Sequence, residues 1–412
     1  MWLIYYAINY LYVLAVRIAA LKSGKAKLWI EGRRKFPEIN IPENKKVIWF
    51  HCASLGEFEQ GRPLIEQIKS EFNSEFILVT FFSPSGYEVR KNYALADFVC
   101  YLPTDLPGNA RRFIKMINPA LVVFVKYEFW AGYLSELKLN NIPAYLVSAR
   151  FRPGQFLLSP GGGWIRKQLS AFRTIFVQDE NSKKLIADKS ENKIVVSGDT
   201  RFDRVLANAA NPATFGIINA LINNRIVFVA GSTWADDEKV IFPINSENVF
   251  TIVAPHEINE SHINSLESIC PQPVVRYSQL NENNSAIYPA TLIIDNIGML
   301  MSVYKLADIT YVGGAFHKQL HNILEPAAMG VPVIFGPFTE KFPEGDELCE
   351  AGGGFKIADR ESFMHIFNEL INKPDLRNTS GKCSSDYVQK NKGATELIMK
   401  ELVFDTKYNL KQ

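Results

Sequence analysis

The 412-residue sequence lacks the cysteine spacing of a disulfide framework or a zinc site. Its five cysteines are odd in number and scattered without a CxxC pair: Cys52, Cys100, Cys270, Cys349 and Cys383. It also lacks an excess of charge, because 45 Lys+Arg stand against 43 Asp+Glu for a net charge of +2. The cysteine pattern points to a reducing compartment, and the balanced charge gives no indication of nucleic-acid binding.

Common catalytic and cofactor motifs are absent as well. The sequence contains no G-x-G-x-x-G fingerprint, no P-loop, no H-E-x-x-H pair and no G-x-S-x-G elbow. It also has no Asp-x-Asp at a strand end to hold a metal-bound diphosphate, since Asp236 and Asp237 are adjacent and follow Trp234 into a predicted helix. We therefore expect neither a metal nor a cofactor, and we disfavour hydrolysis by a catalytic triad.

What the chain does have is an apolar beginning. Residues 1–16 carry no charge, and the run continues past Arg17 to Leu21, close to the roughly 20 residues of a membrane span. Unlike in a signal peptide, the positive charges follow the run: Lys22, Lys25, Lys27, Arg33, Arg34 and Lys35. We expect residues 1–35 to associate with a membrane, and the positive-inside rule places the rest in the cytoplasm. A spanning helix, an interfacial helix and a helix packed on the protein all stay open.

Short apolar runs alternate with helix-like segments and predict two series of buried parallel strands. The first series comprises Val47–Ala53, Phe76–Ser83, Phe98–Leu102, Leu121–Tyr127, Ala144–Ser148, Thr174–Gln178 and Lys193–Ser197. The second comprises Ile226–Gly231, Phe250–Ala254, Ala290–Asp295, Ile309–Gly313 and Val331–Phe335.

This pattern predicts an α/β protein with two Rossmann-like, doubly wound domains that face a cleft. We assign residues 36–205 to the first domain, 206–224 to a linker with one helix, and 225–412 to the second domain. The last helical stretch, Ser385–Leu402, could cross back to the first domain.

Glu57 follows the first strand at the start of a helix, where an open α/β sheet places its ligands. The same residues, Ser54-Leu55-Gly56-Glu57, match the S-x-x-E capping box, in which Glu57 would only bind the N-cap amide. The pattern alone does not choose between a base and a cap. In either case we expect the helix dipole to keep the carboxylate ionised.

The second half has glycine turns at its strand ends: Gly231-Ser232-Thr233, Asp295-Asn296-Ile297-Gly298 and Gly313-Gly314-Ala315. Such turns let backbone amides face an anion, which indicates phosphate contact. Glu325, at a helix start, could accept both hydroxyls of a nucleotide ribose. The alternative is a glutamate that only complements the helix dipole.

Eight short motifs occur in a fixed order: 51–57, 83–86, 101–105, 127–130, 148–150, 231–233, 312–314 and 321–326. They begin with His51-Cys52-Ala53-Ser54-Leu55-Gly56-Glu57 and end with His321-Asn322-Ile323-Leu324-Glu325-Pro326. In this order they closely resemble the motifs of the Kdo transferases, which attach 3-deoxy-D-manno-octulosonic acid (Kdo) from CMP-Kdo to the lipid A precursor of lipopolysaccharide. The likeness extends from the apolar N-terminus to Gly354.

The resemblance implies a GT-B fold whose first domain binds the acceptor and whose second domain binds CMP-Kdo. It implies an inverting, metal-independent transfer at the cytoplasmic face of the inner membrane. Backbone amides and a cation can stabilise the departing monophosphate without a metal. A phosphorylated lipid acceptor that stays in the bilayer also suits the apolar start and its basic flank.

Carried over residue by residue, the resemblance makes Glu57 the general base and Glu128 a second acid that orients the acceptor or supports Glu57. It implies acceptor contacts at Ser54, Gly56, Ser83, Ser85 and Arg150. It implies donor contacts at Ser232, Thr233, Pro255, His256, Gly298, Met299, Leu300, Asn322 and Glu325. Without the resemblance, Glu128, the turn serines and Arg150 would be interpreted as structural or solvated residues.

The sequence departs from the family's pattern in its donor half. His256 stands where an arginine is usual, Met299 replaces an acid, and the stretch from Phe316 to Asn322 differs from Pro-His-Gly-Gly-His-Asn. Lys318 is a candidate to replace the missing cation. Two other functions therefore stay open: another GT-B enzyme that uses a UDP-sugar, and a non-catalytic membrane-bound protein that retains the fold.

Overall fold

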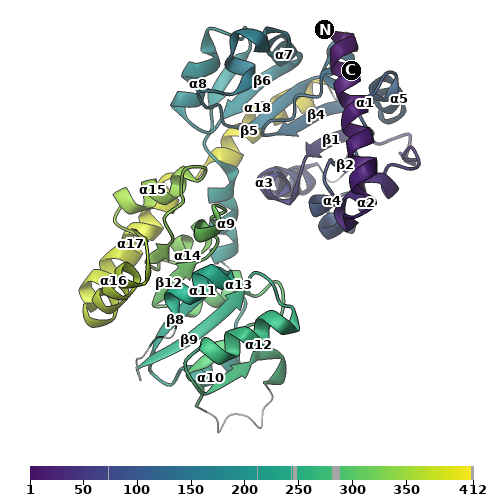
Figure 1. Ribbon diagram of the computed structural model, residues 1–412. Helices are drawn as coiled ribbons and strands as arrows, with labels where there is room; N and C mark the ends of the chain where they lie inside the picture. Colours follow the sequence, from purple (N-terminus) through teal and green to yellow (C-terminus); the bar gives the residue numbers. More distant parts are fainter. Residues whose placement is uncertain (73, 211, 243, 245–247, 281–287, 410–412) are drawn as a thin grey trace. The chain divides into compact units, whose positions relative to one another are not determined.

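The computed structural model describes residues 1–409 apart from 73, 211, 243, 245–247 and 281–287, with residues 404–409 described by their backbone only. The chain divides into two compact units (Figure 1). The first comprises Met1–Arg204 and Lys392–Gln412, and the second comprises Val205–Asn391. Each contains its own parallel sheet, so the α/β class and the doubly wound architecture are confirmed. The cleft expected between the two domains stays a prediction.

The first unit is built on a seven-stranded parallel sheet of order β3-β2-β1-β4-β5-β6-β7. Its strands are β1 Val47–Cys52, β2 Phe76–Phe81, β3 Phe98–Tyr101, β4 Pro119–Val125, β5 Ala144–Ala149, β6 Phe172–Val177 and β7 Lys193–Val196. All seven were predicted, because strands covered on both faces are apolar throughout their length. The sheet separates two apolar clusters, one around Trp49, Phe124 and Tyr133 and the other around Phe50, Phe58 and Val123.

The helices of the first unit are α1 Trp2–Ala19, α2 Gly24–Glu31, α3 Leu55–Glu71, α4 Pro84–Arg90, α5 Asn109–Ile117, α6 Ala131–Leu139, α7 Gly163–Gln168, α8 Glu180–Ala187 and α18 Ala394–Asn409. Helix α9, Thr200–Ala210, begins in the first unit and ends in the second. Helix α18 packs against α3 and β4, and the Asp203 carboxylate accepts hydrogen bonds from the amides of Gly393 and Thr395. The end of the chain thus belongs to the first unit, as the crossover expectation suggested, whereas the sequence assigned residues through 412 to the second domain.

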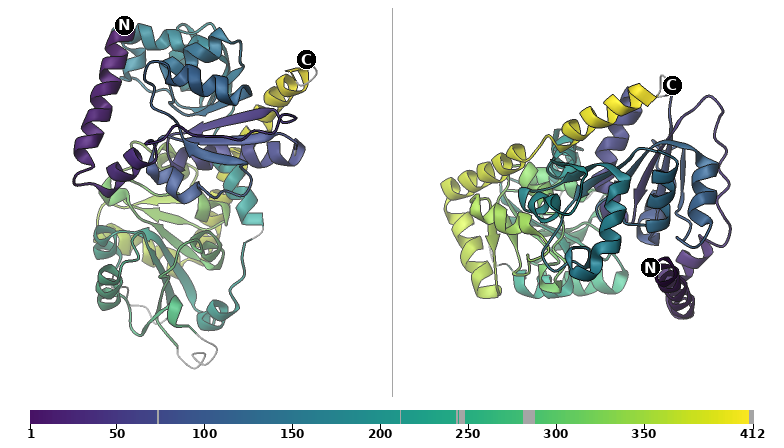
Figure 2. Two further views of the ribbon diagram at one scale, coloured as in Figure 1. Left: turned by 90° about the vertical axis from the view of Figure 1, so that its right-hand side faces the viewer. Right: turned by 90° about the horizontal axis from the view of Figure 1, so that it is seen from above.

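Helix α1 lies along the first unit (Figure 2) and contacts it through a narrow stripe. The Tyr5 hydroxyl donates to Asp105 Oδ2 at 2.6 Å, and the Tyr12 ring packs on Phe82 with centroids 5.9 Å apart. Phe82 follows β2 and Asp105 follows β3, so α1 passes the carboxyl ends of these strands. The opposite face exposes large apolar side chains: Leu3, Ile4, Ile8, Leu11, Leu14 and Ile18. By length and composition α1 alone, of the helices in the described part of the chain, is able to cross a bilayer.

The second unit contains a seven-stranded parallel sheet of order β10-β11-β9-β8-β12-β13-β14. Its strands are β8 Ile226–Thr233, β9 Val249–Pro255, β10 Val274–Arg276, β11 Thr291–Ile293, β12 Ile309–Val312, β13 Val333–Phe335 and β14 Gly354–Lys356. The sequence predicted five of them and missed β10 and β14. Both are edge strands whose apolar runs are very short, Val274-Val275 in β10 and Phe355 alone in β14, and such runs give no periodic signal.

The helices of the second unit are α10 Gly216–Ile222, α11 Ala235–Ile241, α12 Glu260–Ile269, α13 Leu300–Val303, α14 Leu324–Ala328, α15 Pro343–Glu350, α16 Arg360–Asn372 and α17 Pro374–Lys390. The predicted helix Ser385–Leu402 is therefore two helices, α17 and α18, separated at Gly393. Gly393 has φ +106°, a conformation that glycine adopts without strain. The region predicted as a linker with one helix contains α10 and also the end of α9.

Candidate active site

The carboxyl-terminal edge of the first sheet gathers the residues that the sequence singled out in this unit. Glu57 follows β1, Ser83 and Ser85 follow β2, Glu128 follows β4 and Arg150 follows β5. The first two turns are joined directly, because the Ser83 amide donates to the Ala53 carbonyl at 2.7 Å. A parallel sheet brings the ends of neighbouring strands to one edge, which is why residues distant in sequence meet there.

Glu57 lies half-buried in the first turn of α3. Its Oε2 accepts a hydrogen bond from the Ser54 hydroxyl at 2.7 Å. Burial raises the pKa of the Glu57 carboxyl, and the negative charge of Glu128 raises it further. Hydrogen bonds from Ser54 and the positive charge of Lys126 lower this pKa, but by less than burial raises it. Burial is the largest of these effects, so the pKa of Glu57 lies above its usual value; that the carboxylate stays ionised at neutral pH remains a prediction. A raised pKa brings a carboxylate nearer to the value of an effective general base at neutral pH.

Glu128 is buried and held by two donors. Its Oε2 lies 3.0 Å from His51 Nε2 and 2.6 Å from Trp130 Nε1. The other ring nitrogen of His51 lies 2.9 Å from the Thr80 hydroxyl, which also accepts from the Trp49 indole at 2.8 Å. Where the Thr80 hydroxyl donates to His51 Nδ1 rather than to the Phe50 carbonyl at 3.4 Å, a ring proton on His51 Nε2 points at Glu128. The network therefore fixes the orientation of the carboxylate.

Four members of this network had no role assigned from the sequence: Trp49, His51, Thr80 and Trp130. His51 and Trp130 lie inside recognised motifs, and His51 is a fully buried polar side chain in an otherwise apolar strand. Buried polar groups are almost always hydrogen-bonded. A histidine within an apolar strand was thus the available signal, although it does not say which residue is the partner.

The residues expected to contact the acceptor sugar differ in their contacts within the protein. Ser83 caps α4, its Oγ accepting from the Ser85 amide at 3.3 Å and lying 3.0 Å from Ser85 Oγ. Arg150 Nε lies 3.2 Å from Asp179 Oδ2, so this guanidinium has a carboxylate partner within the protein. Gly56 is exposed, and a Cβ there would meet only Ser54 Oγ at 4.0 Å. The space above the start of α3 is therefore open.

Lys126 is a residue that the sequence analysis missed. It directly follows β4 with φ +67°, and its positive charge lowers the pKa of Glu57. A lysine with left-handed backbone is uncommon and marks a turn whose side-chain direction matters. Its place two residues before Glu128 was the only hint in the sequence.

The second unit has a comparable edge at the ends of β8, β9, β11 and β12. Ser232 has φ +53°, and the buried Thr233 hydroxyl donates to Glu238 Oε1 at 2.8 Å. Pro255 ends β9, and the amide of His256 donates to the Thr233 carbonyl at 2.9 Å. The structure therefore brings Ser232, Thr233, Pro255 and His256 together.

Three aromatic rings meet beside this turn. The His256 ring stacks on Trp234 with centroids 4.6 Å apart and on His321 with centroids 4.5 Å apart. The Trp234 indole donates to His321 Nε2 at 3.1 Å, and burial lowers the pKa of His321 to about 4. Because Nε2 accepts this bond in the neutral ring, the proton stands on Nδ1. Where an arginine was expected, the structure has a flat histidine ring within an aromatic stack.

The remaining donor residues lie in two further turns. Gly298 has φ +100° and leads into Met299, the N-cap of α13, and Leu300, its first residue. The Asn322 side chain accepts from the Leu324 amide at 3.2 Å and donates to Glu325 Oε1 at 3.1 Å. Glu325 is thus in the first turn of α14, as predicted, and Asn322 orients it.

Asp237 organises the glycine turns of the second unit, which the sequence analysis did not foresee. Its carboxylate accepts from the amides of Trp234 and Gly314, both at 2.9 Å, and from the Tyr311 hydroxyl at 2.7 Å. A Cβ at Gly313 would lie 2.4 Å from the Ser232 carbonyl oxygen, so only glycine allows the two turns to approach. The available signal was an acid at the third position of a helix, a capping position.

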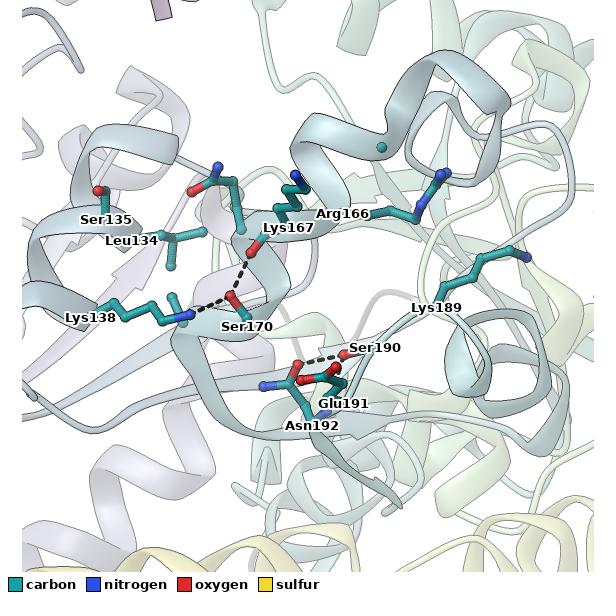
Figure 3. A pocket seen from close by; sticks show the side chains of 13 residues that line it. Leu134, Ser135, Lys138, Arg166, Lys167, Ser170, Lys189, Ser190, Glu191 and Asn192 are labelled. Carbon is teal, nitrogen blue, oxygen red and sulfur yellow. Dashed lines mark hydrogen bonds between the residues drawn. The ribbon is translucent and has the colours of Figure 1, made fainter. Parts of the chain in front are cut away.

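A hollow of about 650 Å³ lies at the other end of the first sheet, beside the amino ends of β6 and β7 (Figure 3). Lys138, Arg166, Lys167 and Lys189 line it, and Lys138 Nζ donates to Ser170 Oγ at 2.8 Å. It is separate from the edge that carries Glu57. Within the described residues, no group of three or more His, Cys, Asp or Glu side chains could hold a metal ion. That the transfer needs no metal stays a prediction.

Solved structures share this architecture. A UDP-N-acetylglucosamine 2-epimerase from Neisseria meningitidis aligns over 87% of this chain and 99% of its own, with 14% identity and a TM-score of 0.58. A glycosyltransferase from Rickettsia africae aligns over 90% of this chain and 100% of its own, with 14% identity and a TM-score of 0.54. At such identities the likeness shows the fold alone. The two parallel sheets are those of the GT-B fold, as the sequence predicted.

Comparisons with sequence relatives indicate which kind of glycosyltransferase the chain resembles. Residues 30–204 match the family model described as 3-deoxy-D-manno-octulosonic-acid transferase (kdotransferase). The 3-deoxy-D-manno-octulosonic acid transferase of Haemophilus influenzae is 26% identical over 371 residues, covering 85% of each chain. That of Aquifex aeolicus is 25% identical over 343 residues, covering 82% of this chain and 90% of its own. The chain is therefore similar to Kdo transferases over most of its length, as the eight motifs predicted.

Proposed function

We propose that this glycosyltransferase transfers Kdo from CMP-Kdo to the phosphorylated lipid A precursor, a tetraacyldisaccharide 4'-phosphate, in lipopolysaccharide synthesis. The names of its relatives support Kdo as the transferred sugar. The observation that carries the proposal is the half-buried Glu57 carboxylate, whose pKa is raised, beside the firmly held Glu128.

In the proposed reaction, Glu57 takes the proton of the attacking acceptor hydroxyl. The hydroxyl oxygen bonds to the anomeric carbon of Kdo, and the bond from that carbon to the CMP phosphate breaks with its electron pair going to CMP. Attack from the face opposite to CMP inverts the configuration. Glu128 supports Glu57 by keeping a negative charge near it, which raises its affinity for the proton.

The donor belongs to the second unit in this proposal. Glu325, oriented by Asn322, accepts hydrogen bonds from the ribose hydroxyls, and the turns at Ser232 and Gly298 face the phosphate. His256 lies where the family's arginine is expected and offers a ring for stacking. We expect transfer to proceed without a metal, so that a chelator leaves the rate unchanged.

We further propose that α1 lies in the membrane interface at the cytoplasmic face of the inner membrane. Tyr5 and Tyr12 attach two successive parts of α1 to the first unit, while the opposite face exposes Ile4, Ile8 and Leu11. A helix with one face on the protein and an apolar opposite face suits an interface better than a span. Its place beside the carboxyl ends of β2 and β3 brings the bilayer to the edge that carries Glu57.

The test is Glu57→Ala in the purified full-length protein, with CMP-Kdo and the acceptor, read by product mass. General bases contribute about 10²- to 10⁴-fold, so we expect transfer to fall by at least about 100-fold while CMP-Kdo binding is retained. Glu71→Gln, at the other end of α3, is the matched control and keeps full activity. Near-normal turnover of the Glu57 variant would refute the assignment.

Nucleotide choice separates this function from a UDP-sugar enzyme of the same fold. A ligand that binds only the folded protein raises its unfolding temperature. We expect CMP to protect the protein from thermal unfolding and UDP to leave it unprotected. Protection by UDP alone would indicate the alternative enzyme, and protection by neither, without transfer, would indicate the non-catalytic protein.

A further inference from the structure

A second hollow, of about 420 Å³, opens in the first unit between α1, α2 and the turn after β2. Tyr12 and Val16 of α1, Ala26 and Trp29 of α2, and Phe82 form its apolar walls. The three aromatic rings are mutually in contact, with centroids 5.7 to 5.9 Å apart. The hollow is thus a built aromatic groove rather than a gap between mobile side chains.

Arg33 fixes the back of this groove. Its guanidinium carbon lies 4.1 Å from the centroid of the Trp29 ring and 5.0 Å from that of Phe82. It also donates to the Phe82 carbonyl at 2.7 Å and to the Leu102 carbonyl at 2.9 Å. These contacts tie the end of α2 to the turns after β2 and β3, so the groove has a defined shape before any ligand binds.

The polar residues of the groove are at two places. Ser23 and Lys25, at the start of α2, are exposed and line the hollow on one side. Ser83, which belongs to the acceptor residues and whose amide binds the Ala53 carbonyl, lines it on another. The groove is therefore continuous with the edge that carries Glu57, and of the residues that line it Lys25 carries a positive charge, beside apolar walls.

We propose that the groove between α1 and α2 binds one acyl chain of the acceptor glycolipid, with Lys25 beside its anionic head. This assignment rests on the proposed function. An apolar interior suits a hydrocarbon chain, and a single ammonium complements a phosphate. One side of α1 lines the groove and its other side exposes apolar side chains. If that exposed side lies in the bilayer, an acyl chain can enter the groove without crossing water.

The matched perturbation is Ala26→Phe, which adds a ring inside the groove, with Leu28→Phe on the exposed face of the same helix as the control. Each variant is assayed with CMP-Kdo and two acceptors: the acylated phosphodisaccharide and the same disaccharide with its acyl chains removed. A buried methylene contributes about fourfold in binding, and a phenyl ring displaces several. We expect Ala26→Phe to lower kcat/KM by at least about tenfold for the acylated acceptor and to leave the deacylated one unchanged.

A photoreactive group on the acyl chain gives a second readout that does not depend on turnover. We expect it to cross-link to peptides that contain Tyr12 or Trp29 and not to cross-link there in Ala26→Phe. Three results would overturn the proposal. Ala26→Phe could lower kcat/KM equally for both acceptors, or lower it for neither. The cross-link could also be displaced by excess phospholipid but not by excess acceptor. If the wild-type protein transfers Kdo to neither acceptor, the proposed function fails instead.

Discussion

The attachment of α1 to the first unit depends on Asp105, a carboxylate that is 1% exposed. Its Oδ2 accepts from the Tyr5 hydroxyl at 2.6 Å and from the Gly132 amide at 2.7 Å, and no cation is among these partners. Burial, only partly offset by these hydrogen bonds, raises the pKa of Asp105 from 3.8 to about 6. The folded protein is therefore less stable with Asp105 ionised than with Asp105 protonated.

The size of this cost follows from the shift of the pKa. Because the folded-state value lies above the unfolded-state value, the folded protein binds the proton more tightly. The contribution of this group to stability is thus fully present below pH 3.8 and is lost as the pH rises through 6. A shift of about two units corresponds to about 3 kcal/mol, of which roughly half is lost only above pH 5.

Asp105→Asn isolates this contribution. We expect the free energy of unfolding of the wild type, measured by urea titration in detergent, to decrease between pH 5 and pH 7.5 by roughly 1 to 2 kcal/mol more than that of Asp105→Asn. The readout is the difference in slope with pH, because a constant offset from the amide group does not affect it. Asp188→Asn, an exposed carboxylate in the same unit, keeps the wild-type slope.

Parallel stability profiles of the wild type and Asp105→Asn would refute this account of the α1 attachment. A steeper decrease of stability with pH in the variant than in the wild type would mean that the pKa of Asp105 is lowered, not raised, by folding. The first result would mean that the hydrogen bonds from Tyr5 and Gly132 fully compensate the buried charge, and the second that they more than compensate it.

Two further predictions concern the active edge and the end of the chain. Removing the Glu128 charge in Glu128→Gln lowers the pKa of Glu57, so the acid limb of kcat/KM shifts to lower pH; an unchanged limb would separate the two carboxylates. Asp203→Ala removes three hydrogen bonds to Gly393 and Thr395 at the start of α18, and we expect about 1–3 kcal/mol less stability in urea unfolding, with the exposed Asp386→Ala as control. Equal midpoints for these two variants would show that α18 does not depend on this cap.

The sheet of the first unit was predictable because its strands are apolar on both faces and alternate with helices. The same rule failed for β10 and β14, where an apolar run of one or two residues carries too little pattern. It also merged α17 and α18, since periodicity continues across Gly393 while the backbone turns. Length of the apolar run, rather than its composition, decided which elements the sequence revealed.

The candidate site was predictable as a set of positions and much less as a set of partners. Glu57, Ser83 and Glu128 follow predicted strands and therefore had to share an edge. By contrast, the pairing of Arg150 with Asp179, and of Glu128 with His51 and Trp130, depends on side-chain directions at turns. Such directions arise from tertiary packing, which local sequence does not encode.

The turn from Ser54 to Glu57 shows why a cap and a base were indistinguishable in sequence. Ser54 occupies the N-cap position of α3 with extended backbone, yet its hydroxyl donates to the Glu57 carboxylate instead of accepting from a backbone amide. The geometry therefore departs from a full capping box at the serine. A hydroxyl committed to an amide would contribute only to helix stability, whereas one committed to the carboxylate orients it and limits the rise of its pKa. The choice between the two depends on the burial of Glu57 and the charge of Glu128, and both become visible only when the strands are assembled.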